Sequence, residues 1–470
     1  MTLRAAWLFG ALAALPAFGA LAQSDTDLAV LKGLSPFAVL SKTTAGNAAL
    51  AANYTVAHGI QTGEITQPTL QPFVEQQQQA LRDVFITSGN LAQLADGLGS
   101  TLEAGYIARA HYIDRTTNFT NLSPTVANVI AYAVATTLEN STSAKFLFAN
   151  ETADGKATAS AKATSLLTDI GGKSDIYGRA YHLAAGSAGA DPLGNSRPFQ
   201  TDSHQLLIVG PDYFNMPADS WVYNHGPLMD LTESPSFPSG HTTYGYTGAL
   251  VLAVLVPERY TQMMVRGAEY GNDRILVGAH YPMDVIGGRT LATYDMAHLL
   301  ANDPAYLGRA FPSVSTVNDF QAIVKAARKD MIRNLEAACG KAIANCALED
   351  TGRLSNPQAN EALYADTQTY NLPVVYPQNV GMHEDVAKLA PEAGYLLTVA
   401  FPSLSLKEAD EILTDTEGPG GGFLDNGSPF GVYSRLNLYA AAARAGALVS
   451  GERVGAHSLS SQRVRDAATQ

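Results

Sequence analysis

Residues 238–256 read Pro-Ser-Gly-His-Thr-Thr-Tyr-Gly-Tyr-Thr-Gly-Ala-Leu-Val-Leu-Ala-Val-Leu-Val. Pro-Ser-Gly ahead of an apolar run predicts a helix over Thr242–Val256, with free backbone N–H groups at its positive end. A phosphate-like anion is the natural ligand of such a helix start. Ser239 adds a hydroxyl donor, Gly240 lets the backbone approach closely, and His241 lies in the first turn. Taken alone, the segment is explained equally well by a helix cap at Ser239 and a surface histidine.

A second segment, residues 274–284, reads Arg-Ile-Leu-Val-Gly-Ala-His-Tyr-Pro-Met-Asp. Pro282 suits the first position of a helix, so His280 lies just before that helix and Asp284 in its first turn. A carboxylate there can accept a hydrogen bond from one ring nitrogen of His280, which orients the other nitrogen and makes it more nucleophilic. Arg274 supplies a planar cation suited to phosphate oxygens.

A third segment, Arg197-Pro198, completes a set that is far more specific than any of its parts. In order, spacing and residue type, the three segments resemble the signature of the type-2 phosphatidic acid phosphatase and vanadium haloperoxidase superfamily. That signature is Lys-x6-Arg-Pro, then Pro-Ser-Gly-His, then Ser-Arg-x5-His-x3-Asp. The similarity covers residues 197–288.

The resemblance implies a role for each matching residue. His280 would attack phosphorus to form a phosphohistidine, and Asp284 would orient His280 and stabilise its cationic form. His241 would protonate the departing alcohol and then activate water. No metal or other cofactor is implied for hydrolysis. Four further groups would hold the phosphoryl oxygens: Arg197, Arg274, Ser239 and the Gly240 N–H.

Two positions depart from the signature. Its lysine falls at Ala190, in a Gly- and Ala-rich stretch that predicts a loop where the family has a helix. The nearest upstream cations, Lys173 and Arg179, are the candidate replacements. The serine before Arg274 is replaced by Asp273, which we expect to point to solvent.

The flanking sequence predicts a mainly α-helical bundle that carries the site between two helix starts. Apolar residues recur at three- and four-residue spacing in Leu70–Ile86, Leu91–Tyr112 and Pro124–Leu138. Later helices are expected from Pro282 and over Val317–Ala338, Ser405–Thr414 and Leu436–Leu448. We predict a helical domain over residues 23–348 and a loop-rich C-terminal extension over 349–470, polar and loop-like in 349–390. The extension forms either a subdomain or a wrap around the bundle.

The N-terminus predicts export. Arg4, the apolar run Ala5–Ala20 and the small residues before Gln23 have the layout of a secretory signal peptide over residues 1–22. The alternative is an N-terminal membrane anchor. No later apolar run is long enough to span a bilayer, so the mature protein is expected to be periplasmic or secreted, without an integral membrane segment. In this respect it is most similar to the soluble exported bacterial acid phosphatases of the superfamily.

The two cysteines, Cys339 and Cys346, are consistent with export, because a disulfide is the default state of such a pair outside the cytosol. On one continuous helix they would be separated by a rise of about 10 Å, too far for a bridge. The chain must therefore turn between them, and Gly340 permits that. Two free thiols, or a two-ligand metal site, are the alternatives.

The composition limits the partners. Of 470 residues, 46% are hydrophobic and 16% charged, and the net charge is −13. These values indicate a globular protein and disfavour nucleic acid and anionic membranes as partners. A small phosphate ester is therefore the expected substrate. Composition leaves the oligomeric state open.

These observations predict an exported acid phosphatase that acts best below neutral pH, because one histidine must be protonated while the other stays neutral. Two alternatives remain open. One is a haloperoxidase that holds vanadate in the same pocket, and the other is a phosphate-binding protein without catalysis. Pocket walls are expected from Tyr213–Leu231, where His225 is more consistent with a loop residue than with a catalytic one.

Overall fold

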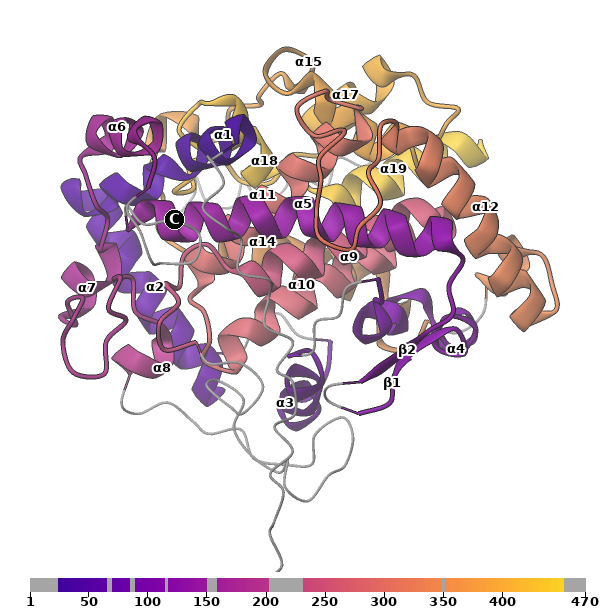
Figure 1. Ribbon diagram of the computed structural model, residues 1–470, viewed down its shortest axis with the longest axis horizontal. Coiled ribbons are helices and arrows are strands. Elements are labelled where there is room, and N and C mark those ends of the chain that lie inside the picture. Colours follow the sequence, from indigo (N-terminus) through magenta and orange to yellow (C-terminus); the bar gives the residue numbers. More distant parts are fainter. Residues whose placement is uncertain are drawn as a thin grey trace, which may run out of the picture.

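The computed structural model describes residues 24–65, 70–84, 89–114, 117–149, 159–202, 231–348 and 351–451. Within these ranges the chain is an assembly of helices with one antiparallel two-stranded sheet (Figure 1). The prediction of a mainly α fold is confirmed. The predicted signal peptide over residues 1–22, His225 and most of Tyr213–Leu231 lie outside the described residues.

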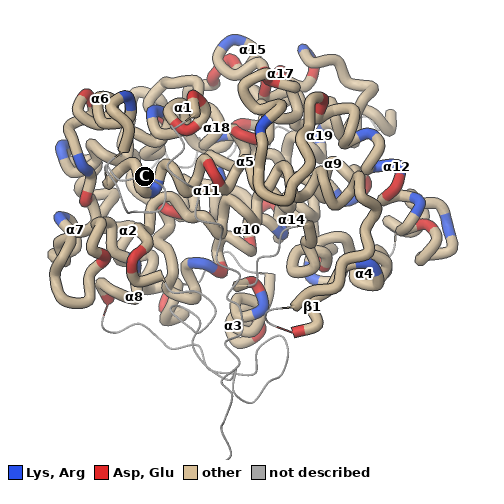
Figure 2. Tube along the Cα trace, in the orientation of Figure 1, with Lys and Arg blue, Asp and Glu red and all other residues tan. Residues whose placement is uncertain are grey.

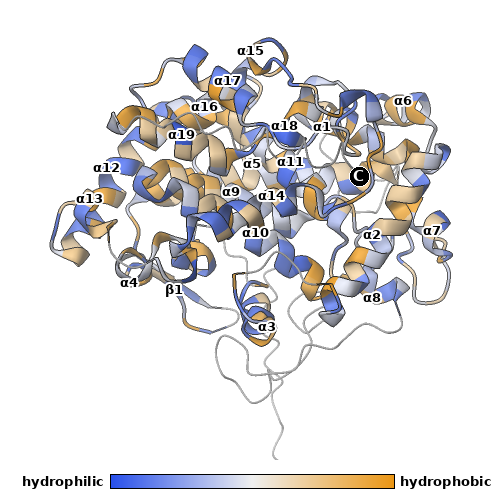
Figure 3. Ribbon diagram, turned by 180° about the vertical axis from the view of Figure 1, so that it is seen from behind, coloured by the Kyte–Doolittle hydropathy of each residue, from blue (hydrophilic) through white to orange (hydrophobic). Residues whose placement is uncertain are grey.

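The centre of the molecule is helix α9 (Gly240–Leu255), whose residues from His241 onward are all buried. A helix that is apolar around its whole circumference must be covered on every side. Its cover is formed by α5 (Pro124–Phe148), α10 (Tyr260–Leu276) and α11 (Pro282–Leu300). Helix α9 contains no Lys, Arg, Asp or Glu, whereas Figure 2 shows such residues on most of the helices around it. Figure 3 shows the hydrophobic residues of α9 in the middle of the molecule.

Glycines allow α9 and α11 to start side by side. A Cβ on Gly288 would lie 2.5 Å from the backbone oxygen of Ser239, and one on Gly287 would lie 2.7 Å from the Phe237 ring. The Thr243 hydroxyl donates to the Gly288 carbonyl at 3.3 Å. Because real Cβ atoms do not approach this closely, only glycine at these positions lets the two helix starts come together.

The N-terminal half surrounds this centre with shorter elements. The predicted helix over Leu91–Tyr112 is wrong: the chain forms a 3-10 turn over Ala92–Leu98 and bends at Gly99, where φ is 83°. A helix over Ser100–Ile107 follows, and the chain then enters the two-stranded sheet. The elements that precede or follow α5 are α1 (Asp25–Leu34), α2 (Thr44–Thr62), α3 (Phe73–Arg82), α4 (Ser100–Ile107), β1 (Ala110–Tyr112), β2 (Asn118–Thr120), α6 (Ala161–Ile170), α7 (Ile176–Tyr181) and α8 (Pro198–Thr201).

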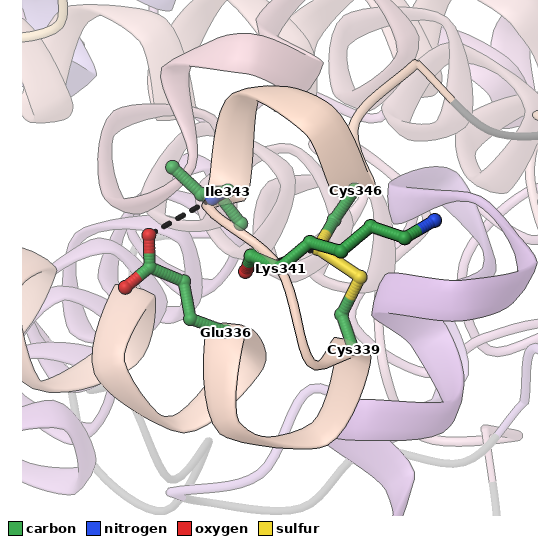
Figure 4. Close-up of a disulfide and its surroundings, with 5 residues drawn as sticks. All are labelled: Glu336, Cys339, Lys341, Ile343 and Cys346. Atoms are coloured by element: carbon green, nitrogen blue, oxygen red, sulfur yellow. Dashed lines mark hydrogen bonds between the residues drawn. A yellow bond between two sulfur atoms is a disulfide. The ribbon is translucent and has the colours of Figure 1, made fainter.

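A disulfide closes the turn between α12 (Phe320–Cys339) and α13 (Ile343–Cys346), as Figure 4 shows. Gly340 ends α12 with a φ of 76°, which turns the chain back on itself. The Cα atoms of Cys339 and Cys346 are thereby 6.2 Å apart, and the Glu336 carboxylate accepts the Ile343 N–H at 2.9 Å. The predicted disulfide and the turn at Gly340 are confirmed.

The C-terminal segment, residues 351–451, packs onto the bundle. Helices α14 (Pro357–Thr369) and α19 (Leu438–Ser450) contact α10, and α18 (Pro429–Arg435) contacts α11. The expectation that residues 349–390 are loop-like is wrong for α14. Between α14 and α18 lie α15 (Val386–Leu389), α16 (Tyr395–Thr398) and α17 (Leu406–Asp415). Among the described residues, no helix combines the length and the apolar character that crossing a membrane requires.

Candidate active site

The site lies where α9 and α11 begin, next to the last turns of α5. Six of the seven predicted residues are buried, with exposed fractions between 0% and 8%, and Gly240 is half-buried. The rings of His241 and His280 lie 6.2 Å apart between centroids. The Ser239 N–H donates to the Asp284 carbonyl at 3.0 Å. The two segments that carry the histidines are therefore joined directly by their backbones.

His280 has one nitrogen toward a carboxylate and the other toward a guanidinium. Its Nδ1 lies 3.3 Å from the Asp284 carboxylate, and its Nε2 lies 3.0 Å from Nη1 of Arg197. A guanidinium can only donate hydrogen bonds, so Nε2 must accept and the ring proton must be on Nδ1. The arrangement leaves the lone pair on Nε2, which is the nitrogen available for attack.

Asp284 is held by donors that the sequence did not reveal. Its carboxylate accepts hydrogen bonds from the Ser236 hydroxyl, from the Tyr177 hydroxyl at 2.6 Å and from the Tyr281 N–H at 2.8 Å. Burial raises the pKa of Asp284 to about 6, and these hydrogen bonds, together with the charge of Arg197, oppose the rise. Near neutral pH the carboxylate is therefore ionised and can orient His280.

Arg197 is fixed by backbone acceptors. Its guanidinium donates to the carbonyls of Ser234 at 2.8 Å and Ala279 at 3.0 Å, and to the Ser234 hydroxyl at 3.2 Å. It is 1% exposed, and burial lowers its pKa to about 10. The side chain therefore stays charged at neutral pH and lies beside Nε2 of His280.

The start of α9 provides the amide donors. The Ser239 hydroxyl accepts the Thr242 N–H at 3.1 Å, so Ser239 is a helix cap whose hydroxyl proton can still be donated. The amides of Gly240 and His241 belong to the first turn, where the helix itself offers no acceptors. The cap and the predicted anion site are therefore compatible.

Arg274 is buried near the end of α10. Its Nη2 donates to the Ala80 carbonyl at 2.9 Å, and its Nε has no hydrogen-bond partner among the described residues. The expectation that Asp273 points to solvent is wrong: Asp273 is fully buried, 3.4 Å from the Gln79 amide nitrogen. Burial raises the pKa of Asp273 well above its ordinary value, and the charge of Asp83 acts in the same direction.

Both histidines are buried among cations. Burial holds the pKa of His241 well below its ordinary value, and the charges of Arg274, Arg197 and Lys145 lower it further. Burial also lowers the pKa of His280, with Arg197 and Lys145 as the next contributions. In the ligand-free protein at neutral pH both rings are therefore uncharged, and the surrounding field is positive.

Neither candidate replacement for the lysine at Ala190 lies in the site, since Lys173 and Arg179 are both exposed. The predicted loop around Ala190 is confirmed. A buried lysine that the sequence did not point to, Lys145 of α5, lies at the site instead, with its Nζ 3.4 Å from the Ser234 hydroxyl. The available signal was that Lys145 is the only basic residue in a helix of 25 residues.

Comparison with known proteins supports the interpretation of this region. Residues 190–303 match the model of the PAP2 superfamily. The chain therefore carries a PAP2 superfamily domain, and the resemblance found in the sequence is confirmed. Within the described residues, no cluster of three or more His, Cys, Asp and Glu side chains has an arrangement that could hold a metal ion.

Relatives with known names are phosphatases. The chain is 44% identical over 107 residues to a non-specific acid phosphatase of Salmonella typhimurium, which covers 20% of this chain and 43% of the relative. It is 42% identical over 69 residues to an acid phosphatase of Zymomonas mobilis, covering 15% and 26%. It is 35% identical over 78 residues to a lipid A 1-phosphatase of Rhizobium johnstonii, covering 17% and 31%. The chain thus spans less than half the length of these relatives.

Proposed function

We propose that this protein is an exported phosphomonoesterase of the acid phosphatase type that works through a phosphohistidine intermediate. The observation that carries the proposal is the arrangement around His280. Nδ1 of His280 lies 3.3 Å from the Asp284 carboxylate, and Nε2 lies 3.0 Å from Nη1 of Arg197. The proposed nucleophile, His280, and the anion-binding group, Arg197, are therefore in contact at the Nε2 atom.

In the first step, Nε2 of His280 forms a bond to phosphorus and the bond between phosphorus and the ester oxygen breaks. His241 donates its proton to that oxygen, and the alcohol leaves. A phosphoryl oxygen takes over the hydrogen bond that Arg197 gives to Nε2 in the ligand-free state. The Asp284 carboxylate offsets the positive charge that develops on the imidazole.

In the second step, His241 accepts a proton from water as the water oxygen attacks phosphorus. The bond between phosphorus and Nε2 breaks, and inorganic phosphate leaves. The guanidiniums of Arg197 and Arg274 and the amides at the start of α9 stabilise the charge on the equatorial oxygens in both steps. Over both steps one water molecule is consumed, and His241 regains from it the proton that it gave to the alcohol.

The pKa of His241 accounts for an acidic optimum. Three cations and burial lower it in the ligand-free site, so a lower pH is needed before His241 carries the proton that the leaving alcohol takes up. A bound phosphate ester neutralises part of the cationic field and raises the pKa of His241 again. We therefore expect turnover to be fastest below neutral pH.

Small phosphate esters suit the protein better than polyanions. The chain has a net charge of −13, and the cations of the site are buried. Export to the periplasm or the medium is supported by the N-terminal sequence pattern and by the disulfide between Cys339 and Cys346. The exported acid phosphatases of the superfamily share this context.

The decisive experiment measures release of phosphate from para-nitrophenyl phosphate, nucleotides, sugar phosphates and lipid phosphates by the mature protein and by His280→Ala. We expect turnover in the wild type and loss of turnover in His280→Ala. Arg197→Ala should mainly weaken the binding of the phosphate group. His383→Ala is the matched control, because His383 is exposed and lies outside the site. Absence of aryl phosphate hydrolysis from about pH 4 to about pH 8 would overturn the proposal.

Two further measurements separate the alternatives left open by the sequence. Halide oxidation with vanadate and hydrogen peroxide, in a protein that does not hydrolyse phosphate esters, would identify a haloperoxidase. Phosphate binding without turnover of any ester would identify a non-catalytic binding protein. Trapping of a phosphorylated histidine after rapid acid-free denaturation supports the proposed intermediate directly, because phosphohistidine is acid-labile.

A further inference from the structure

Lys145 is a buried lysine that forms an ion pair with no carboxylate of the described residues. Lys145 lies near the C-terminal end of α5 and is 8% exposed. Buried lysines are normally paired with a carboxylate. No carboxylate of the described residues forms an ion pair with Lys145, and its recorded side-chain contact is the neutral Ser234 hydroxyl at 3.4 Å. Within the described part of the chain, the ammonium group therefore has no anionic partner, and an anionic ligand could provide one.

The contact with Ser234 places Lys145 in the phosphate site. The same hydroxyl accepts a hydrogen bond from Nη2 of Arg197 at 3.2 Å. The two cations thus converge on one oxygen atom, and Arg197 also reaches Nε2 of His280. A phosphoryl group bound to Arg197 beside His280 is therefore within the neighbourhood of the Lys145 ammonium.

The face of α5 that carries Lys145 also borders the start of α9. Ser141 is one turn earlier on α5, and residues four apart lie on the same helix face. Its hydroxyl accepts a hydrogen bond from Thr243 at 3.3 Å and would lie 3.9 Å from a Cβ on Gly240. This face of α5 is therefore aligned with the amides that open α9.

The electrostatic environment agrees with this placement. Burial lowers the pKa of Lys145 to about 7, and the charge of Arg197 adds to this effect, while Asp284 and Asp191 oppose it. In turn, Lys145 lowers the pKa of both His241 and His280. Two neighbouring cations destabilise each other until an anion binds between them. A phosphate ester would remove that repulsion.

We propose that Lys145 is a phosphate-binding residue, so that α5, outside the region that matches the superfamily, supplies the cation missing at Ala190. The proposal rests on the proposed function, because it names a residue of the same site. It assigns the chain's phosphate contacts to four separate segments: α5, the loop before α8, the start of α9 and the end of α10.

The test compares Lys145→Met, Lys145→Arg and the control Lys173→Met in the full mature chain. Kd for inorganic phosphate is measured by calorimetry, and kcat and KM with para-nitrophenyl phosphate. We expect Lys145→Met to weaken phosphate affinity and to raise KM by about ten- to a hundredfold, because a charged hydrogen bond to the anion is lost. Lys145→Arg should recover part of the affinity, and Lys173→Met should behave as the wild type.

A pH profile supplies a readout that a purely structural role would not change. Removing the charge of Lys145 raises the pKa of His241, so the alkaline limb of kcat/KM in Lys145→Met should move to higher pH. In the wild type, kcat/KM also falls at alkaline pH because Lys145 itself loses its proton. The Lys145→Met variant has no such ionisation. Both effects shift the limb in the same direction.

The outcomes separate this inference from the function. Unchanged phosphate affinity in folded Lys145→Met, within about twofold, overturns the inference and leaves the phosphatase proposal standing. If Lys145→Met weakens phosphate binding but the wild type hydrolyses no ester, the proposed role of Lys145 is supported and the proposed phosphatase activity is overturned. Absence of phosphate binding by the wild type overturns both. Should Lys145→Met fail to fold, Lys145→Gln, which keeps a polar group near Ser234, replaces it in the same assays.

Discussion

The hydrogen bonds to Asp284 lower the pKa of its carboxylate and so determine the lowest pH at which the carboxylate stays ionised. The carboxylate has a pKa of about 6, raised by burial and held down most by the hydrogen bond from Ser236. Ser236 also lies 3.4 Å from Nδ1 of His280, so one hydroxyl touches both members of the pair. Ser236 is therefore a positioning residue for the pair formed by Asp284 and His280.

Substituting Ser236→Ala removes a donor that favours the charged form of Asp284. The pKa of Asp284 then rises above about 6. We expect the acid limb of the kcat/KM profile to move to higher pH, with a loss of about tenfold in kcat/KM at the wild-type optimum. Ser160→Ala, at the start of α6 far along the chain, serves as the control and should leave the profile unchanged.

The sequence motifs predicted two kinds of site residue: those close together in the chain, and those that match the spacing of the superfamily signature. Asp284 and His280 are four apart, and their pairing follows from a helix that starts at Pro282. The residues that were missed, Tyr177, Ser236 and Lys145, reach the site through tertiary packing. Their sequence separations from Asp284 carry no periodic signal, so only the folded chain shows the contacts.

At the scale of elements, the close contact of α9 with α11 aligns the two histidines. The contact depends on Gly288, where a Cβ would meet the Ser239 oxygen at 2.5 Å and the Thr243 nitrogen at 3.2 Å. These neighbours are backbone atoms of the helix start, which cannot turn aside as a side chain can. The spacing of the two helices is therefore coupled to the geometry of the site.

We expect Gly288→Ala to lower the melting temperature and to reduce kcat/KM by at least about tenfold, because the two helix starts must move apart. Gly446→Ala in α19 is the matched control, since nothing lies within 4 Å of its added Cβ. That substitution should leave activity unchanged and stabilise the protein by up to about 1 kcal/mol. Equal effects of the two substitutions, measured by thermal unfolding and kinetics, would show that the helix contact is unimportant.

The elements that could be predicted are those with clear apolar periodicity or clear ends, such as α9, α11, α12, α17 and α19. Helix α10 was missed because it buries charged residues, which interrupt the apolar pattern: Arg266 is 0% and Glu269 5% exposed. The helix α14 was missed because its polar surface reads as a loop. In both cases tertiary contacts, rather than local pattern, decide the structure.

At the scale of the whole molecule, buried charges join the C-terminal segment to the bundle. Arg353 contacts Glu269 of α10 at 2.7 Å and Asp96 at 2.9 Å. Asp96 in turn accepts from Arg266 at 2.7 Å. One network thus connects three distant parts of the sequence, and residues from all of them belong to the same hydrophobic core.

Arg353→Met leaves two carboxylates of this network with fewer partners. We expect the free energy of unfolding to fall by about 2 kcal/mol, less than for a fully buried ion pair, because the Arg353 side chain is 20% exposed. Arg333→Met is the matched control, because Arg333 has a side chain that is 68% exposed and pairs with its neighbour Asp330. Denaturant unfolding of both variants measures the difference, and equal midpoints would contradict the role of Arg353.

The hydrogen bond from Arg197 to Nε2 of His280 has a consequence for chemical selectivity. In the resting state a cation covers the lone pair of the nucleophile, and both groups are buried. A neutral electrophile brings nothing that draws the guanidinium away, whereas an anionic ester does so as it binds. Under the proposed mechanism, the imidazole would thus be shielded from adventitious alkylation and acylation, and the charge of an anionic ester would release its reactivity.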